Sequence, residues 1–133
     1  MSTYVVDTVA FIKYLADELP EKVDKIFRDA EKGFSVLLLP HIVIGEFAYI
    51  SLKNKIKTED PAASIREVLH LVYSSSYFRC VDMDLECWEE FLKLDIPELH
   101  DRMICSIARA KKATVITSDE SILKRRGIES VWG

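Results

Sequence analysis

The sequence is poor in the features that mark several classes of protein. Its three cysteines, Cys80, Cys87 and Cys105, are odd in number and lack C-x-x-C spacing. This pattern is typical of reduced thiols in a cytoplasmic protein and gives little support to a zinc site. No apolar run approaches the roughly 20 residues that a membrane helix needs. The start, MSTYVVDTVAF, has no basic segment and its apolar run is interrupted by Asp7, which argues against a signal peptide.

The chain also lacks a surplus of positive charge. Its formal net charge is −4, whereas domains that coat nucleic acid by bulk electrostatics are usually basic. A local basic groove stays open, with KNKIK (residues 53–57) and KRR (residues 124–126) as candidate segments for an RNA path. Lysines and arginines at helix ends are otherwise solvated partners of the helix dipole.

What the chain does contain is the balance of a globular protein: 49% of its residues are hydrophobic and 30% are charged. Its 133 residues are enough for one domain with a substantial core and too few for two ordinary ones. There is no internal repeat, low-complexity tract or linker. We therefore expect a single domain over residues 1–133.

Short β-rich runs alternate with longer helical patterns along the chain. Strands are predicted at residues 3–6, 35–39, 77–81 and 114–117 and over the terminal GIESVW. Helices are predicted at residues 8–14, 20–32, 40–53, 61–74, 84–94, 98–112 and 118–126. This alternation predicts an α/β fold, a three-layer α/β/α sandwich with a mainly parallel sheet of about five strands.

Four carboxylates, far apart in the sequence, are expected at one edge of that sheet. Asp7 directly follows the first strand, and Asp119 follows the strand TVIT after one serine. Asp101 begins a helix that must run antiparallel to TVIT, and Glu46 lies in the first two turns of the helix after SVLLL. Ligands bind at the carboxyl ends of parallel strands, so this edge is the predicted site.

Each aspartate also has a purely structural interpretation. Asp7 fits the N-cap of the helix that follows it. Thr117 and Glu120 fit a capping box, and Asp119 would then complement the helix dipole. Asp101 lies in a first helical turn, where a carboxylate is favourable, and the helix N-terminus is expected to help keep it ionised.

Glu46 is harder to explain as a structural residue. It shares a helical stripe with Ile42 and Ile50, and a carboxylate in an apolar arc costs several kcal/mol unless it is paired or binds a cation. Gly45 beside it weakens the helix by about 1 kcal/mol relative to alanine, which fits a place where something approaches closely. These features favour a functional role for Glu46.

Clustered carboxylates repel one another, so some would take up protons at neutral pH unless a cation compensates. An all-oxygen cluster suits Mg²⁺ or Mn²⁺, and such ions activate water for attack on phosphorus. The reaction indicated is hydrolysis of a phosphodiester. His41 and His100 lie near the same edge but are left out of the predicted site, since a two-metal mechanism needs no histidine base.

The motifs VVDTVAFIKYL, IGEFAYI, ELHDRMICSIARA and VITSDESILKRRGIESVW occur in the order and at the spacing of a PIN domain. The chain resembles this family of metal-dependent nucleases, which includes the VapC-type toxins of toxin–antitoxin pairs. The resemblance covers nearly the whole chain. It implies a five-stranded parallel sheet between helices, RNA as substrate, an antitoxin protein as partner, and a homodimer.

Residue by residue, the acidic quartet of the family falls on Asp7, Glu46, Asp101 and Asp119, which the resemblance makes the ligands of Mg²⁺ or Mn²⁺ and the catalytic groups. Thr8 and Thr117 match hydroxyl positions that support the acidic site. Arg102, next to Asp101, is a candidate RNA-backbone contact, or else a solvated charge that balances Glu98.

Other interpretations compete with this one. Asp82 and Asp84, which follow the strand YFRCV, resemble the D-x-D of Toprim nucleases, although we interpret both as caps of the next helix. A haloacid-dehalogenase phosphatase needs D-x-D after its first strand, and a receiver domain needs an acidic pair before its aspartyl strand; the chain has neither. A PIN nuclease of RNA processing and a catalytically silent PIN scaffold stay open as alternative functions.

Overall fold

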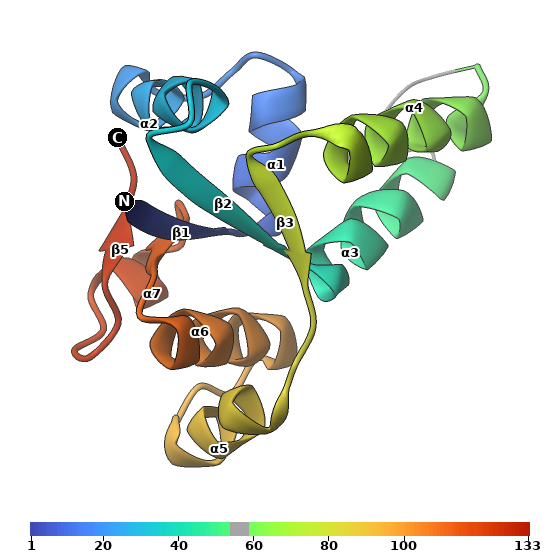
Figure 1. The fold of residues 1–133 in the computed structure, drawn as a ribbon. Coiled ribbons are helices and arrows are strands. Elements are labelled where there is room, and N and C mark those ends of the chain that lie inside the picture. The colour runs from blue at the N-terminus through green and yellow to red at the C-terminus, as the bar shows by residue number, and fades with distance from the viewer. Residues whose placement is uncertain (54–58) are drawn as a thin grey trace.

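In the computed structural model, which describes residues 1–53 and 59–133, five strands form one sheet with seven helices around it (Figure 1). The strands are β1 Ser2–Val6, β2 Ser35–Pro40, β3 Phe78–Val81, β4 Thr114–Ile116 and β5 Ser130–Val131. All four pairings are parallel, and the spatial order is β3-β2-β1-β4-β5. The predicted α/β fold is confirmed, and the sheet is wholly rather than mainly parallel.

The helices are α1 Thr8–Leu15, α2 Glu21–Glu31, α3 His41–Leu52, α4 Pro61–Ser74, α5 Leu85–Lys93, α6 Leu99–Lys111 and α7 Glu120–Leu123. Their ends follow local chemistry. Asp60 accepts a hydrogen bond from the Ala63 amide at 3.1 Å, so it caps α4 just before Pro61. Gly33 follows α2 with a φ of +89°, a conformation that glycine adopts at little cost. Only α7 ends well short of its predicted limit.

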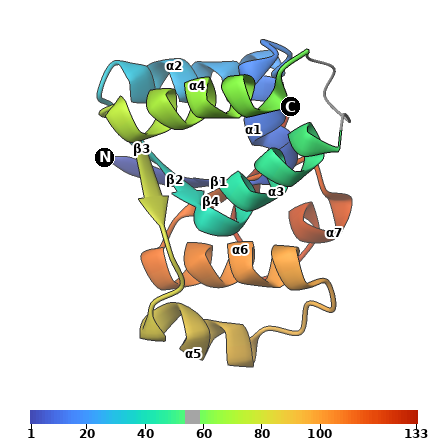
Figure 2. The same ribbon diagram turned by 90° about the vertical axis from the view of Figure 1, so that its right-hand side faces the viewer.

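Helices cover both faces of the sheet (Figure 2). Helices α1, α2 and α4 lie on one face and α6 on the other, with α5 packed against the outer side of α6. Helix α3 packs against α1 and α4. All six residues of β2 are buried, which explains why SVLLL has no polar alternation.

The central strand β1 pairs with β2 on one side and β4 on the other. From β1 the chain first adds β2 and β3 on one side, and then adds β4 and β5 on the other side. Such a change of side is a topological switch point, which leaves a crevice at the carboxyl ends of the two strands, here β1 and β4. A further hydrogen bond joins β1 and β4 at their carboxyl ends: the amide of Asp7, directly after β1, donates to the carbonyl of Ile116, the last residue of β4, at 3.2 Å.

Two further expectations concern cysteine and the membrane. None of the three cysteines forms a disulfide; Cys87 and Cys105 are buried and Cys80 is half-buried. Within residues 1–53 and 59–133, no helix has both the length and the apolar character needed to cross a bilayer.

Candidate active site

One pocket of about 190 Å³ at the carboxyl edge of β1 and β4 contains all four predicted carboxylates. They reach it from four places: the start of α1, the second turn of α3, the first turn of α6 and the segment after β4. The convergence expected from strand and helix directions is therefore present. The pocket is lined by Asp7, Thr8, Val9, Glu46, Glu98, His100, Asp101, Ile104, Ser118 and Asp119.

Asp7 is both the N-cap of α1 and one of the carboxylates that line the pocket. Its Oδ1 accepts the Ala10 amide at 2.8 Å, so it is the N-cap of α1, and only 8% of the residue is exposed. Burial raises the pKa of the Asp7 carboxyl; hydrogen bonds from Thr117 and Ala10 oppose this, and the charges of Asp119 and Glu46 add to it.

Thr117 connects two of the aspartates. The side chain is fully buried, it hydrogen-bonds the Asp7 carboxyl, and its Oγ1 accepts the Asp119 amide at 3.0 Å. Asp119 in turn accepts the Ser121 amide at 2.9 Å and its hydroxyl at 2.7 Å. The N-cap of α7 is thus Asp119 itself, and the capping box expected from Thr117 and Glu120 does not form, because the Thr117 hydroxyl bonds Asp119 and Asp7 instead.

Glu46 is held by a hydroxyl. The Thr8 Oγ1 donates to Glu46 Oε1 at 2.6 Å, and the Glu46 side chain is 30% exposed, toward the pocket. It therefore avoids the full cost of burial in an apolar arc. The close approach expected at Gly45 is not made by the described residues, because a Cβ added there would have no atom of theirs within 4 Å.

Asp101 is the most perturbed carboxyl of the four. Burial, a hydrogen bond with Asp119, and the charges of Asp119, Glu98 and Asp7 together raise the pKa of Asp101 to about 7. The same hydrogen bond, together with those from Ser121, lowers the pKa of Asp119, so the shared proton resides on Asp101. The predicted proton uptake by clustered carboxylates is present here.

The expectation that the helix N-terminus keeps Asp101 ionised is wrong. The N-cap of α6 is Glu98, whose Oε2 accepts the Asp101 amide at 2.6 Å. Glu98 thus takes the favourable interaction with the helix end and adds a negative charge beside Asp101. The position of Glu98 immediately before the first helical residue is the sequence feature from which this N-cap could have been predicted.

His100 lines the pocket, although the sequence-based prediction left it out of the site. Its Nδ1 lies 2.7 Å from Glu98 Oε1 and its Nε2 lies 4.0 Å from Glu46 Oε2. The hydrogen bond to Glu98 and the charges of Glu46 and Asp101 raise the pKa of His100 despite partial burial. The HD pair in ELHDR was the only sequence signal, because a first-turn neighbour of Asp101 had to lie near the same edge.

Arg102 turns away from the pocket. Its Nε donates to the Phe91 carbonyl at 3.0 Å, its Nη1 lies 3.5 Å from the Ile96 carbonyl, and the guanidinium lies 4.6 Å from the centre of the Phe91 ring. The alternative of a solvated charge that balances Glu98 does not describe this side chain either, because these carbonyls hold the guanidinium. A contact between Arg102 and RNA stays a prediction. In the structure, this side chain already binds the end of α5 and the segment that connects α5 to α6.

The basic segments are placed only in part. Of KNKIK, residues 54–57 lie outside the described part of the chain, and the Lys53 ammonium lies 4.6 Å from the centre of the Tyr49 ring. In KRR, Lys124 pairs with Glu120 at 3.4 Å and Arg125 donates to the Asp95 carbonyl at 3.0 Å. Neither Lys124 nor Arg125 lines the pocket that contains the four predicted carboxylates.

The rival D-x-D pair serves local structure. Asp84 accepts the Cys87 amide at 3.0 Å and pairs with Lys111 at 2.5 Å, so it caps α5 and ties it to α6. Asp82 accepts the next amide, that of Met83, at 2.9 Å and lies 4.0 Å from His41 Nδ1, and its side chain is 82% exposed. The prediction that both cap the helix is therefore right for Asp84 alone.

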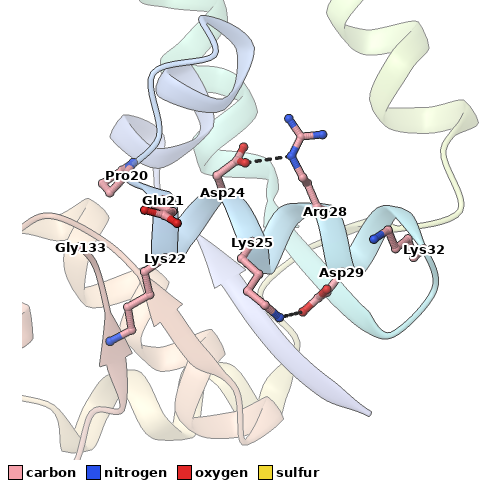
Figure 3. Close-up of a pocket in the computed structure, with 9 residues that line it drawn as sticks. All are labelled: Pro20, Glu21, Lys22, Asp24, Lys25, Arg28, Asp29, Lys32 and Gly133. Carbon is pink, nitrogen blue, oxygen red and sulfur yellow. Dashed lines mark hydrogen bonds and ion pairs between the residues drawn. The ribbon is translucent and has the colours of Figure 1, made fainter.

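A larger cavity, of about 790 Å³, runs along the outer side of α2 (Figure 3). Four of its charged side chains form two pairs, Arg28 with Asp24 at 2.9 Å and Lys25 with Asp29 at 3.1 Å. Such exposed pairs along one helix stabilise it slightly. None of the four predicted carboxylates lines this cavity.

The donor set of the smaller pocket fits a hard divalent cation. The four predicted carboxylates supply oxygen ligands, which Mg²⁺ and Mn²⁺ prefer. Burial raises the pKa of Asp7 and of Asp101, and the charges of neighbouring carboxylates add to both shifts, so a bound cation would favour the ionised forms. In the present side-chain positions, no three His, Cys, Asp or Glu residues among those the structure describes are arranged to hold a metal. Side-chain rotation would accompany binding.

Comparisons with known proteins agree on the fold. A chain of the DNA-bound VapBC2 crystal structure from Rickettsia felis superimposes with a TM-score of 0.74 at 17% identity, covering 98% of this chain and 99% of that one. DNA-bound VapBC from Salmonella typhimurium gives 0.72 at 18% identity, covering 98% of each chain. PAE2754 from Pyrobaculum aerophilum gives 0.64 at 21% identity, covering 98% of this chain and 91% of that one.

No curated protein gives a significant match to the chain by sequence. The sequence model of the PIN domain, in contrast, matches residues 4–128. This match extends from β1 to the segment before β5 and includes the four predicted carboxylates, Asp7, Glu46, Asp101 and Asp119. The chain belongs to the PIN domain family.

Proposed function

We propose that the protein is a divalent-metal-dependent endoribonuclease that hydrolyses RNA phosphodiester bonds, and that it is the toxin of a toxin–antitoxin pair. The observation that carries the proposal is the meeting of Asp7, Glu46, Asp101 and Asp119 in one pocket. Repelling carboxylates at a switch point of a parallel sheet favour a cation site. Membership of the PIN family and the likeness to VapBC structures support the same function.

The four carboxylates would hold Mg²⁺ or Mn²⁺. When bound, such an ion supplies a water of lowered pKa and positive charge for the developing negative charge on the phosphodiester. The chain's own residues orient the oxygens: Thr8 holds Oε1 of Glu46, and Thr117 holds the Asp7 carboxyl and the Asp119 backbone. The buried Thr117 hydroxyl thereby links the ends of β1 and β4.

Two protein partners belong to the proposal, an antitoxin and a second copy of the chain. The antitoxin is supported by the similarity to VapBC structures. A protein contact is supported by α3, which has no polar face although Tyr49 and Leu52 are both 59% exposed. A mostly apolar helix with such exposed side chains is often covered by a partner. Helix α3 also carries Glu46 of the pocket.

The experiment uses purified protein free of any partner, incubated with single-stranded and structured RNA with and without Mn²⁺. Cleavage is expected with the metal and not with a chelator, and Asp7→Asn is expected to abolish it. Melting temperatures measured alongside are expected to rise with Mn²⁺, because an ion that binds only the folded state stabilises it by mass action. The matched control is Asp82→Asn, which removes an exposed carboxylate outside the pocket.

The outcomes separate the alternative functions. A rise in melting temperature without cleavage of either RNA would contradict the nuclease and favour a silent scaffold that still binds metal. The absence of both effects would overturn the proposal as a whole. Cleavage limited to one structured RNA would favour an RNA-processing nuclease over a toxin that inactivates many RNAs.

A further inference from the structure

The side chain of Glu98 fixes the orientation of the His100 ring. Glu98 Oε2 accepts the Asp101 amide at 2.6 Å and its Oε1 lies 2.7 Å from His100 Nδ1. An ionised carboxylate can only accept, and the hydrogen bonds from Asp101 and His100 lower the pKa of Glu98 although partial burial opposes this. The proton of the short contact therefore belongs to Nδ1, and Glu98 is itself immobilised by the helix end that it caps.

The other ring nitrogen, Nε2, faces the carboxylates. It lies 4.0 Å from Glu46 Oε2, beyond hydrogen-bond distance, and no described residue of 1–53 or 59–133 forms a hydrogen bond with it. His100 and Glu46 both line the candidate pocket. A separation of 4.0 Å is too long for a direct bond but is compatible with two atoms that each lie about 2.0–2.2 Å from one shared ion.

We propose that His100 Nε2 is a nitrogen ligand of the metal site, alongside Glu46, and that Glu98 is the carboxylate that orients the ring. This inference rests on the proposed metal-dependent function and adds a residue to it. A histidine that binds a metal through one nitrogen and donates its other N–H to a carboxylate is a frequent arrangement, because the carboxylate fixes the tautomer and raises the basicity of the ligand.

A nitrogen ligand changes which ion the site prefers. Imidazole suits transition metals, whereas Mg²⁺ takes oxygen ligands almost alone. The chain is therefore expected to bind Mn²⁺ more tightly than Mg²⁺. His100→Ala is expected to weaken Mn²⁺ binding about tenfold or more and to change Mg²⁺ binding much less. The preference of the site for Mn²⁺ over Mg²⁺ is therefore expected to decrease in this variant.

The direct test is electron spin-echo spectroscopy of the wild-type protein loaded with Mn²⁺ at pH 8, without an affinity tag. A coordinated imidazole gives a ¹⁴N coupling in the Mn²⁺ signal. The coupling is expected in the wild type and in His41→Ala, and it is expected to be lost in His100→Ala. His41 is the matched control, because its Nδ1 also lies 4.0 Å from a carboxylate oxygen, that of Asp82, outside the pocket.

Titration of both metals by calorimetry completes the test. Bound Mn²⁺ without a ¹⁴N coupling in the wild type would overturn the role of His100 and leave the carboxylate site in place, as would equal Mn²⁺ affinity of His100→Ala and wild type. Failure of the wild type to bind either metal would instead overturn the proposed function together with this inference. Melting of metal-free His100→Ala at the wild-type temperature shows that the variant is folded.

Discussion

Asp101 holds a proton up to about pH 7, whereas an aspartate in an unfolded chain loses it near pH 3.9. Between these two values the folded state binds more protons than the unfolded state, so this group makes the protein less stable as the pH rises. Its contribution is favourable at pH 4 and lost by pH 8. Burial and the neighbouring carboxylates therefore disfavour the ionised form of Asp101 when no cation is bound.

We expect Asp101→Asn to remove this pH dependence in the metal-free protein. Asparagine keeps a hydrogen-bond donor for Asp119 and carries no charge, so the variant melts near the wild-type temperature at pH 5 and at a higher temperature at pH 8. Thermal denaturation in a chelator at both pH values measures the effect, and Asp82→Asn is the control. An equal difference at pH 5 and pH 8 would contradict the assigned ionisation of Asp101.

Thr117 is the second residue whose removal gives a defined result. Valine has nearly the same shape and no hydroxyl, so Thr117→Val leaves the buried Asp7 oxygen and the Asp119 amide without their partner. A loss of about 1–3 kcal/mol in the free energy of unfolding is expected, measured by urea denaturation. Thr117→Ser keeps the hydroxyl and is the control; a variant with valine that is no less stable than the one with serine would show that these bonds contribute nothing.

At the scale of elements, α6 connects the pocket to the outer layer. Its N-cap, Glu98, and two residues of its first turn, His100 and Asp101, lie at the carboxylate cluster, while Arg102, one residue further on, points to α5. Consecutive helical residues point about 100° apart, which is why neighbours in ELHDR have different roles. The guanidinium binds the Phe91 carbonyl in α5 and the Ile96 carbonyl in the connection between α5 and α6, and it lies over the Phe91 ring.

Arg102→Lys is expected to destabilise the protein by about 1–2 kcal/mol, since an ammonium group cannot reproduce the planar fork of donors or its contact with the ring. Urea denaturation is the measurement, with the exposed Arg66→Lys on α4 as control. Unchanged stability together with a higher KM for RNA would instead assign Arg102 to the RNA backbone, as the sequence-based hypothesis has it.

Most of the elements could be predicted because their limits are set locally. Pro61 and Asp60 define the start of α4, and the unbroken apolar run of β2 identifies a strand covered on both faces. The directions of strands and helices then bring Asp7 and Asp119 to one edge. No spatial detail is needed for that step.

Three features of the pocket could not be predicted, because they depend on distances between groups from different elements. The pKa of Asp101 reflects burial and its contact with Asp119, and the orientation of His100 reflects Glu98 on one side and Glu46 on the other. From the sequence, Thr117 fits either a capping box with Glu120 or, by resemblance to the family, a hydroxyl that supports the acidic site. Only the geometry distinguishes the two.

For the whole molecule, the two outer layers differ in how they expose apolar side chains. Helix α3 exposes Tyr49 and Leu52 and has no polar face. Helix α5 exposes Leu85 and Leu92, at 76% and 73%, but is amphipathic and separates them with glutamates. We therefore assign the proposed homodimer contact to α3.

The double variant Tyr49→Ser, Leu52→Ser is expected to convert the homodimer to a monomer, because serine removes apolar area that a partner would cover. Sedimentation of the wild type is expected to give about twice the chain mass of 15.3 kDa, and the variant the single mass. At protein concentrations too low for the wild type to dimerise, the variant should melt close to the wild-type temperature, since both side chains are exposed in the single chain. Leu85→Ser, Leu92→Ser is the matched control on α5. Dissociation by this control instead, or a monomeric wild type at 100 μM, would contradict the assignment to α3.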